Sequence, residues 1–168
     1  DLNMENHKLG KLINQTVKAH QDQARLRNIS LNVQLEEDIN IVVDASAFSI
    51  ILSNFVTNAL KHSPSNSEIL IKNDLEDDFL TTLSVIDHGK GIPKKYRDRV
   101  FERFFRVDKG RAKHSGGTGL GLAISKHLAR LMGYEVGMKP NKPNGSRFWI
   151  SVNYASSEEE KSLTPELA

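Results

Sequence analysis

The sequence predicts an α+β fold in which a mixed β-sheet carries helices on one face. Segments with helical apolar spacing are interspersed with segments in which apolar and polar residues alternate. The expected order is helix, two strands, helix, two strands, a long loop, helix and two strands, and short turns join neighbouring strands. The chain has 168 residues, which is enough for one domain with a sizeable core.

Three segments are predicted to be helices. Residues 9–24 carry apolar side chains at i, i+3, i+4, i+8 and i+15, which fits one amphipathic helix. Residues 48–62 have an apolar side along their length. Pro64 follows them, and a helix ends there because proline lacks an amide hydrogen and clashes with the preceding turn. Residues 120–132 have one apolar stripe, and Gly133 suits the position after the last helical turn.

Six segments are predicted to be strands. The first two, residues 29–35 and 39–43, are separated by a turn-like acidic sequence, so we expect them to form a β-hairpin. The other four are residues 68–72, 79–86, 134–138 and 147–154. Residues 87–118 contain no convincing strand and only a short helical patch, and a loop of this length is usually functional or mobile.

The composition excludes several classes of function. Lys and Arg number 23 against 21 Asp and Glu, and this near balance argues against a nucleic-acid partner. The chain has no cysteine, which excludes disulfides, thiolate zinc sites and cysteine nucleophiles. No apolar run reaches the roughly 20 residues that span a bilayer, and the first residues lack signal-peptide character. We therefore expect a soluble intracellular domain without membrane contact.

Asn54, Asn58 and Lys61 share a polar strip on the second predicted helix, at i, i+4 and i+7. A solvated helix face would explain such a strip. Asparagines are poor helix formers, however, and a neutral amide oxygen is a suitable Mg²⁺ ligand. A lysine one turn further on could meet a phosphate. The residues alone leave both readings open.

Residues 87–93, DHGKGIP, follow a predicted apolar strand. Glycines at such a position let the backbone approach a ligand, and an aspartate at a strand end can accept a hydrogen bond from an exocyclic amine. A simple turn is the commoner explanation of such a string.

Residues 116–121, GGTGLG, run directly into the third predicted helix. Glycine amides and a helix N-terminus together form an anion site, so a phosphate is the natural ligand. No Lys-Ser or Lys-Thr follows the last glycine, which excludes a P-loop, and the spacing does not fit a dinucleotide fingerprint. A flexible turn before a helix remains the alternative.

Residues 101–106, FERFFR, combine an aromatic group with Arg106 and lie in the long loop. More basic residues follow, namely Lys109, Arg111, Lys113 and His114. The aromatic rings would suit a core. An apolar group that packs against the fold, followed by a basic, glycine-terminated segment, is however typical of a lid over a polyphosphate.

The four motifs occur in a specific order. NFVTNALKHSP, DHGKGIP, VFERFFR and GGTGLGLAISKHL resemble the N, G1, F and G2 boxes of the ATP-binding catalytic domain of histidine kinases, in the GHKL superfamily. The resemblance spans residues 44–149. It implies the Bergerat ATP-binding fold, a two-layer α/β sandwich with a mixed sheet of about five strands, three helices on one face and a long ATP lid.

The resemblance also implies roles for individual residues. Asn58 matches the ligand of the Mg²⁺ that bridges the ATP phosphates, and Lys61 and Arg106 match basic residues near the phosphates, so these three form the implied catalytic set. Asp87 matches the aspartate that recognises the adenine amino group. The other implied nucleotide-binding residues are Asn54, His62 (where many relatives have tyrosine), Gly89, Gly91, Ile92, Phe105, Gly117, Thr118, Gly119, Leu120 and Gly121.

The implied function is transfer of the γ-phosphate of ATP, with Mg²⁺, to a histidine on a separate dimerisation domain, for relay to an aspartate of a response regulator. The six histidines of the chain lack the family's phosphoacceptor context: His7, His20, His62, His88, His114 and His127. We therefore expect the acceptor on another domain.

The expected organisation is an N-terminal helix at residues 1–25 that includes part of a linker, an ATP-binding domain at 26–154 and a disordered tail at 155–168. We expect the isolated chain to be a monomer. Its parent protein is expected in the cytoplasm or anchored in the inner membrane.

Two other classes share this ATP-binding fold. Gyrase-like, mismatch-repair and chaperone ATPases carry a glutamate general base one turn before the metal asparagine, as do the serine kinases that act as anti-sigma factors. This chain has Asn54 there, whose amide cannot accept a proton at neutral pH. A non-catalytic nucleotide sensor would be expected to have a broken box, and all four boxes are intact here.

Overall fold

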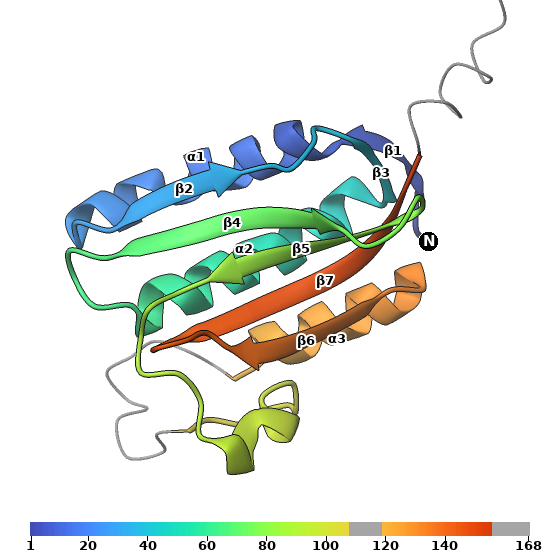
Figure 1. The fold of residues 1–168 in the computed structure, drawn as a ribbon. Helices are drawn as coiled ribbons and strands as arrows, with labels where there is room; N and C mark the ends of the chain where they lie inside the picture. Colours follow the sequence, from blue (N-terminus) through green and yellow to red (C-terminus); the bar gives the residue numbers. More distant parts are fainter. Residues whose placement is uncertain (108–118, 156–168) are drawn as a thin grey trace, which may run out of the picture.

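The computed structural model describes residues 1–107 and 119–155 (Figure 1). Its helices are α1 (Leu9–Leu26), α2 (Ala45–His62), the 3₁₀ helix η1 (Lys94–Arg99) and α3 (Gly121–Met132). Its strands are β1 (Glu5–Lys8), β2 (Ser30–Gln34), β3 (Asn40–Val43), β4 (Glu68–Leu75), β5 (Leu80–Ile86), β6 (Glu135–Pro140) and β7 (Ser146–Ala155).

The strands form one mixed sheet. Its order is β1-β3-β7-β5-β4-β2, with β6 paired to β7 beside β3. Strands β2 and β4 are parallel and the other pairs are antiparallel. Helices α1, α2 and α3 all cover the same face of the sheet (Figure 1). The predicted fold class is confirmed, and the described sheet has seven strands where about five were expected.

The hairpin predicted for residues 29–43 is wrong. Strand β2 pairs in parallel with β4, from Ser30 opposite Glu68, whereas β3 pairs with β1 and β7. Alternating polarity shows which residues share a face of the sheet, but it carries no information about the partner strand. Strand β1 escaped prediction because its four residues are mostly exposed and polar.

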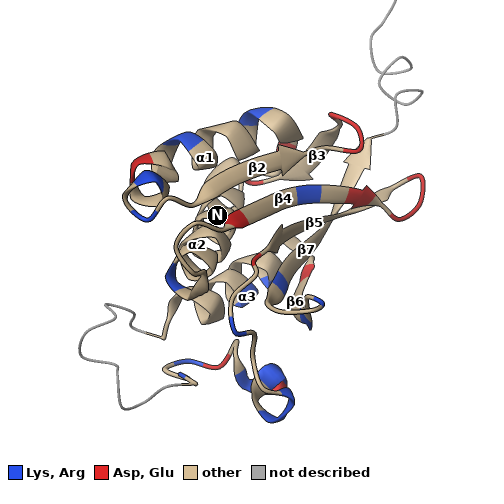
Figure 2. Cartoon of the chain, turned by 60° about the vertical axis from the view of Figure 1, so that its left-hand side comes forward, with Lys and Arg blue, Asp and Glu red and all other residues tan. Residues whose placement is uncertain are grey.

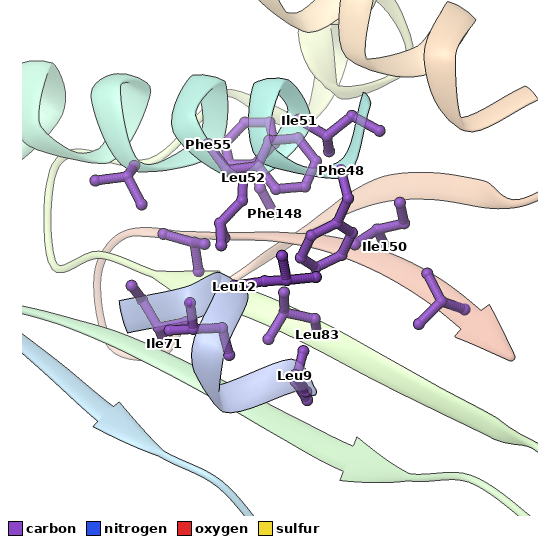
Figure 3. Packing of buried hydrophobic residues seen from close by; sticks show 14 of the residues in the cluster. Leu9, Leu12, Phe48, Ile51, Leu52, Phe55, Ile71, Leu83, Phe148 and Ile150 are labelled. Carbon is purple, nitrogen blue, oxygen red and sulfur yellow. The ribbon is translucent and has the colours of Figure 1, made fainter. Parts of the chain in front are cut away.

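One hydrophobic core lies between the helices and the sheet (Figure 3). Helix α1 contributes Leu9 and Leu12, and α2 contributes Phe48 and Phe55. The Phe148 ring of β7 lies 5.7 Å from the Phe55 ring, measured between centroids. Because α1 and α2 bury their apolar faces in the same core, the polar face of α2 has a fixed orientation relative to the sheet.

Side-chain hydrogen bonds hold ends of both long helices, and two of the side chains come from segments distant in the sequence. The Asp38 carboxylate accepts a hydrogen bond from the Gly10 amide in the first turn of α1, at 3.0 Å. Asp44 is the N-cap of α2 and accepts from the Ala47 amide at 2.9 Å. At the other end of α2, the Arg27 guanidinium donates to the carbonyls of Leu60 and Ser63. A cation there is favourable because the C-terminal carbonyls of a helix carry partial negative charge.

We predict that Asp44→Ala destabilises the protein by about 1 kcal/mol at pH 7, the usual effect of removing an N-cap. Hydrogen bonds from the Ala47 and Asn3 amides hold the pKa of the Asp44 carboxyl below its ordinary value. A lowered folded-state pKa gives stability above the unfolded pKa that is lost as pH falls through the folded value. The difference from wild type, measured by urea unfolding, should therefore shrink on acidification. The exposed Asp22 offers a control as Asp22→Ala, and an equal effect there would contradict the capping role.

Candidate nucleotide-binding site

The polar strip of α2 lies on the part-exposed side of the helix, opposite its core-facing residues. Asn54 and Asn58 are half-buried and Lys61 is exposed. Partial desolvation lowers the pKa of the Lys61 ammonium, and the positive charge of Arg106 lowers it further. The structure thus brings Lys61 and Arg106 close enough to repel one another, although they are far apart in the sequence. Two such cations suit a polyanion.

Asp87 follows directly after β5, and it is 2% exposed. Its Oδ1 accepts hydrogen bonds from the Gly89 amide at 2.9 Å and the Ser146 amide at 3.3 Å. Desolvation raises the pKa of the Asp87 carboxyl, an effect that these two hydrogen bonds and the nearby His62 and His88 partly offset. A buried carboxylate held by two amides is an oriented acceptor.

Three segments meet at Asp87: the end of α2, the loop after β5 and the turn between β6 and β7. A Cβ on Gly89 would overlap the carbonyl oxygen of His62, and one on Gly145 would overlap the carbonyl oxygen of Asp87. Gly91 lies against the Gly145 carbonyl, with φ of +74°. The loop can therefore approach the helix and the turn only because these positions are glycine.

Asn54 contacts α3. Its Nδ2 donates to the Gly121 carbonyl at 2.9 Å and to Ser125 Oγ at 3.1 Å. Ser125 is fully buried and also donates to the Gly121 carbonyl, at 2.9 Å. The Asn54 side-chain Nδ2 thus joins α2 to the first turn of α3, and the role of Asn54 in nucleotide binding stays a prediction.

The segments on either side of residues 108–118 are joined by a hydrogen bond. The Phe104 amide donates to the Gly119 carbonyl at 2.9 Å. The Phe105 ring lies 5.6 Å from the Tyr96 ring and 4.6 Å from the Arg99 guanidinium carbon. Phe105 is thus packed against η1.

The remaining predicted residues lie around the same elements or outside the described part of the chain. Leu120 is the N-cap of α3 and Gly121 is its first residue. Ile92 packs against the core, and its carbonyl accepts from the Arg97 side chain at 3.1 Å. Gly117 and Thr118, with the second part of the predicted lid (residues 108–118), lie outside the described residues.

Basic residues gather between residues 90 and 106 (Figure 2). They are Lys90, Lys94, Lys95, Arg97, Arg99, Arg103 and Arg106. Two acids, Asp98 and Glu102, lie in the same stretch, and Glu102 forms a 3.3 Å ion pair with Arg99. The balance is positive, and it favours an anionic ligand or partner near the start of the predicted lid.

The residues present fit a magnesium ion that is held mainly by a bound polyphosphate. Within residues 1–107 and 119–155, no group of three or more His, Asp or Glu side chains is placed to hold a metal. Mg²⁺ is usually bound by one or two protein oxygens together with phosphate oxygens and water, so a single amide oxygen, predicted to be that of Asn58, would suffice as protein ligand.

A hollow of about 670 Å³ lies elsewhere, beside α1. Lys11, Lys18, Leu35 and Asp38 are among its lining residues, and none of the predicted site residues is. It is therefore a separate feature of the molecule.

Sequence reasoning missed the residues that hold the site in place. Asn141 donates from Nδ2 to the Asp87 carbonyl, and Ser146 and Ser125 make the contacts given above. The sequence pattern GSRF at residues 145–148 was a signal for the Ser146 contact. Asn141 lies in a loop of prolines and polar residues, where nothing in the pattern distinguishes it.

Comparisons with known proteins agree with this geometry. Residues 43–156 match the family described as "Histidine kinase-, DNA gyrase B-, and HSP90-like ATPase". The sensor histidine kinase WalK of Bacillus subtilis (strain 168) is 36% identical over 126 residues, which cover 74% of this chain and 21% of WalK. The chain thus spans about a fifth of that relative's length.

The solved structures that this chain resembles include histidine kinases as well. The mycobacterial sensor histidine kinase MprB matches with a TM-score of 0.78 and 26% identity, over 92% of this chain and 99% of that one. Full-length ShkA in complex with AMPPNP matches with a TM-score of 0.81 and 27% identity, over 94% of this chain and 32% of that one. The chain belongs to the histidine kinase-, DNA gyrase B- and HSP90-like ATPase family. Its named relatives place it with the ATP-binding catalytic domains of histidine kinases, which confirms the resemblance.

In the described part of the chain, none of the helices combines the length and the apolar character that crossing a bilayer requires.

We predict that Asp87→Asn leaves the protein at least as stable as wild type at pH 7. The asparagine Oδ1 can still accept from Gly89 and Ser146, and the cost of burying a charge disappears. Because the pKa of Asp87 is raised in the folded state, wild-type stability falls as pH rises from the unfolded value through the folded one. The advantage of the variant in urea unfolding should therefore vanish at low pH. The exposed Asp98, as Asp98→Asn, controls for the change in net charge, and marked destabilisation of Asp87→Asn alone at pH 7 would contradict this account.

Proposed function

We propose that this domain binds Mg-ATP between α2, the loop after β5 and the start of α3, and transfers its γ-phosphate to a histidine of a separate dimerisation domain. The observation that carries the proposal is the buried Asp87 carboxylate, oriented by two backbone amides at the end of β5. The family's ATPase description and the AMPPNP complex of ShkA support an adenine nucleotide as ligand.

The adenine end of the site would be formed by Asp87 and the loop that follows it. Both amide hydrogen bonds end on Oδ1. The proposal assigns Oδ2 as acceptor for the exocyclic amine of adenine, because an ionised carboxylate is an acceptor only. Gly89 and Gly91 would let the backbone of this loop lie against the base.

The phosphate end would be formed by Asn58, Lys61 and Arg106. When bound, Mg²⁺ would neutralise phosphate charge, with the Asn58 amide oxygen as its protein ligand. Lys61 and Arg106 already lie near each other, and a polyphosphate between them would relieve their mutual repulsion. Gly119 and Gly121 would bring backbone amides to the phosphates at the start of α3. Such a site catalyses transfer by position and charge rather than by a covalent intermediate.

The phosphate acceptor would come from another domain. His62 and His88 lie beside Asp87, at the adenine end, and attack on the γ-phosphorus needs an in-line nucleophile about 3–3.5 Å away. We therefore infer a dimerisation domain as partner, and a response regulator as the next acceptor. The proposed state of the isolated chain is a monomer, and the proposed location of the parent protein is the cytoplasm or the inner membrane.

An ATP-hydrolysing, gyrase-like module is the second candidate. In that class a glutamate would activate water from the position of Asn54. Here the Asn54 amide donates hydrogen bonds to Gly121 and Ser125, so it is a donor engaged in the structure rather than a base. This observation favours the kinase.

The Asp87 assignment predicts weaker nucleotide binding by Asp87→Asn. Replacing the charged acceptor should reduce the free energy of ATP binding by about 1.5–3 kcal/mol, the range for hydrogen bonds to charged groups. Titration calorimetry measures this directly. Equal affinities of variant and wild type would remove Asp87 from the site.

The metal assignment predicts that Asn58→Ala loses the magnesium dependence of ATP binding while the protein stays folded. Thr57→Ala is the matched control, because Thr57 is exposed on the same helix and donates only to the Ser53 carbonyl in the described contacts. Binding would be titrated with magnesium and with a chelator. If Asn58→Ala keeps a full magnesium response, another group holds the ion.

The transfer step predicts that the chain alone does not label itself on histidine. With radiolabelled ATP, acid-labile label should appear only when the dimerisation domain of the parent kinase is added as a separate chain. Asn58→Ala should abolish this labelling. Acid-labile label on the 168-residue chain by itself would overturn the proposal that the acceptor lies elsewhere.

A further inference from the structure

The turn between β6 and β7 is fastened to the strand end that carries Asp87. Asn141 Nδ2 donates to the carbonyls of Asp87 and Asn144, both at 3.1 Å, and lies 3.4 Å from His88 Nδ1. The backbone amide of Asn141 also donates to the Gly145 carbonyl, at 3.0 Å. One side chain therefore orders its own turn and holds it against the residue that carries the buried carboxylate.

Hydrogen bonds hold the backbone of Asp87 at both its amide and its carbonyl. Its amide donates to the Ser146 carbonyl at 2.9 Å, and its carbonyl accepts from Asn141. Its Oδ1 accepts from the amides of Gly89 and Ser146. The contacts with Gly89 and Ser146 use backbone groups, which substitution does not remove. Asn141 supplies a side-chain contact to the same residue, so it can be changed without touching Asp87.

We propose that Asn141 is a positioning residue for adenine recognition. It fixes the carbonyl of Asp87 and the turn that presents the Ser146 amide, and so it sets the direction in which Oδ2 points. This inference rests on the proposed function, in which Oδ2 accepts from the 6-amino group. Asn141 thereby determines specificity for a 6-aminopurine through Asp87, without a role at the phosphates.

The test compares two nucleotides on the 168-residue chain. ATP carries the 6-amino group, whereas purine riboside 5′-triphosphate lacks it and keeps the same sugar and phosphates. Wild type should prefer ATP. Asn141→Ala should reduce the ratio of the two affinities about fivefold, the contribution of one neutral hydrogen bond, with the affinity for the purine riboside nucleotide unchanged. Loss of a residue that merely stabilises the fold would weaken the binding of both nucleotides equally.

Two further variants complete the test. Asn141→Asp keeps the shape of the side chain but places an acceptor against the Asp87 carbonyl, so it should lose at least as much preference for ATP. Asn144→Ala is the control: Asn144 is exposed on the same turn, and its carbonyl, which the change leaves intact, is the group that Asn141 contacts.

The outcomes separate the two proposals. If wild type prefers ATP and both Asn141 variants keep the wild-type ratio, the positioning role is overturned and the assignment of Asp87 stands. An equal loss of affinity for both nucleotides in the Asn141 variants also overturns the positioning role. If wild type does not distinguish the nucleotides, the assignment of Asp87 to adenine fails, and the role of Asn141 fails with it.

Discussion

The hydrogen bonds that Gly89 and Ser146 donate to Asp87 Oδ1 are the constraint on which the site depends. They hold an ionisable group in a buried position whose desolvation raises its pKa. They also join the loop after β5 to the first residue of β7. Buried polar groups persist only when their hydrogen bonds are satisfied. Here the partners are two backbone amides, that of Gly89 in the loop after β5 and that of Ser146 at the start of β7.

Helix α2 connects this constraint to the rest of the molecule. Its apolar side carries Phe48 and Phe55 into the core, while its polar side carries Asn58 and Lys61. Asn54, one turn before Asn58, joins α2 to the first turn of α3 through Gly121. The positions of the proposed metal ligand and of the proposed phosphate-binding amides are thus set by one helix and its neighbour. The same helix packs into the core and carries the polar side chains, so the packing fixes where Asn58 and Lys61 lie.

The sequence predicted the parts of this architecture that local periodicity encodes. The helices at residues 48–62 and 120–132 agree with α2 and α3 to within a few residues at either end. Strand pairing was not encoded: β2 lies beside β4 rather than β3 because alternation does not identify a partner. The motifs predicted that distant segments come together, and the structure brings Lys61 near Arg106 and Asp87 near His62. The binding of a nucleotide by these residues stays a prediction. The orientation of Asn54 and the contact made by Asn141 depend on tertiary geometry, and no spacing rule predicts them.

The central claim is that the base of ATP lies against Asp87. It is tested most directly by the amide NMR signals of Gly89 and Ser146, which donate to the carboxylate that the base would engage. Titration with Mg-ATP should shift both signals strongly, with smaller changes in α1. Unmoved Gly89 and Ser146 signals, with the shifts gathered instead at Lys11 and Lys18 beside the hollow of α1, would contradict the account.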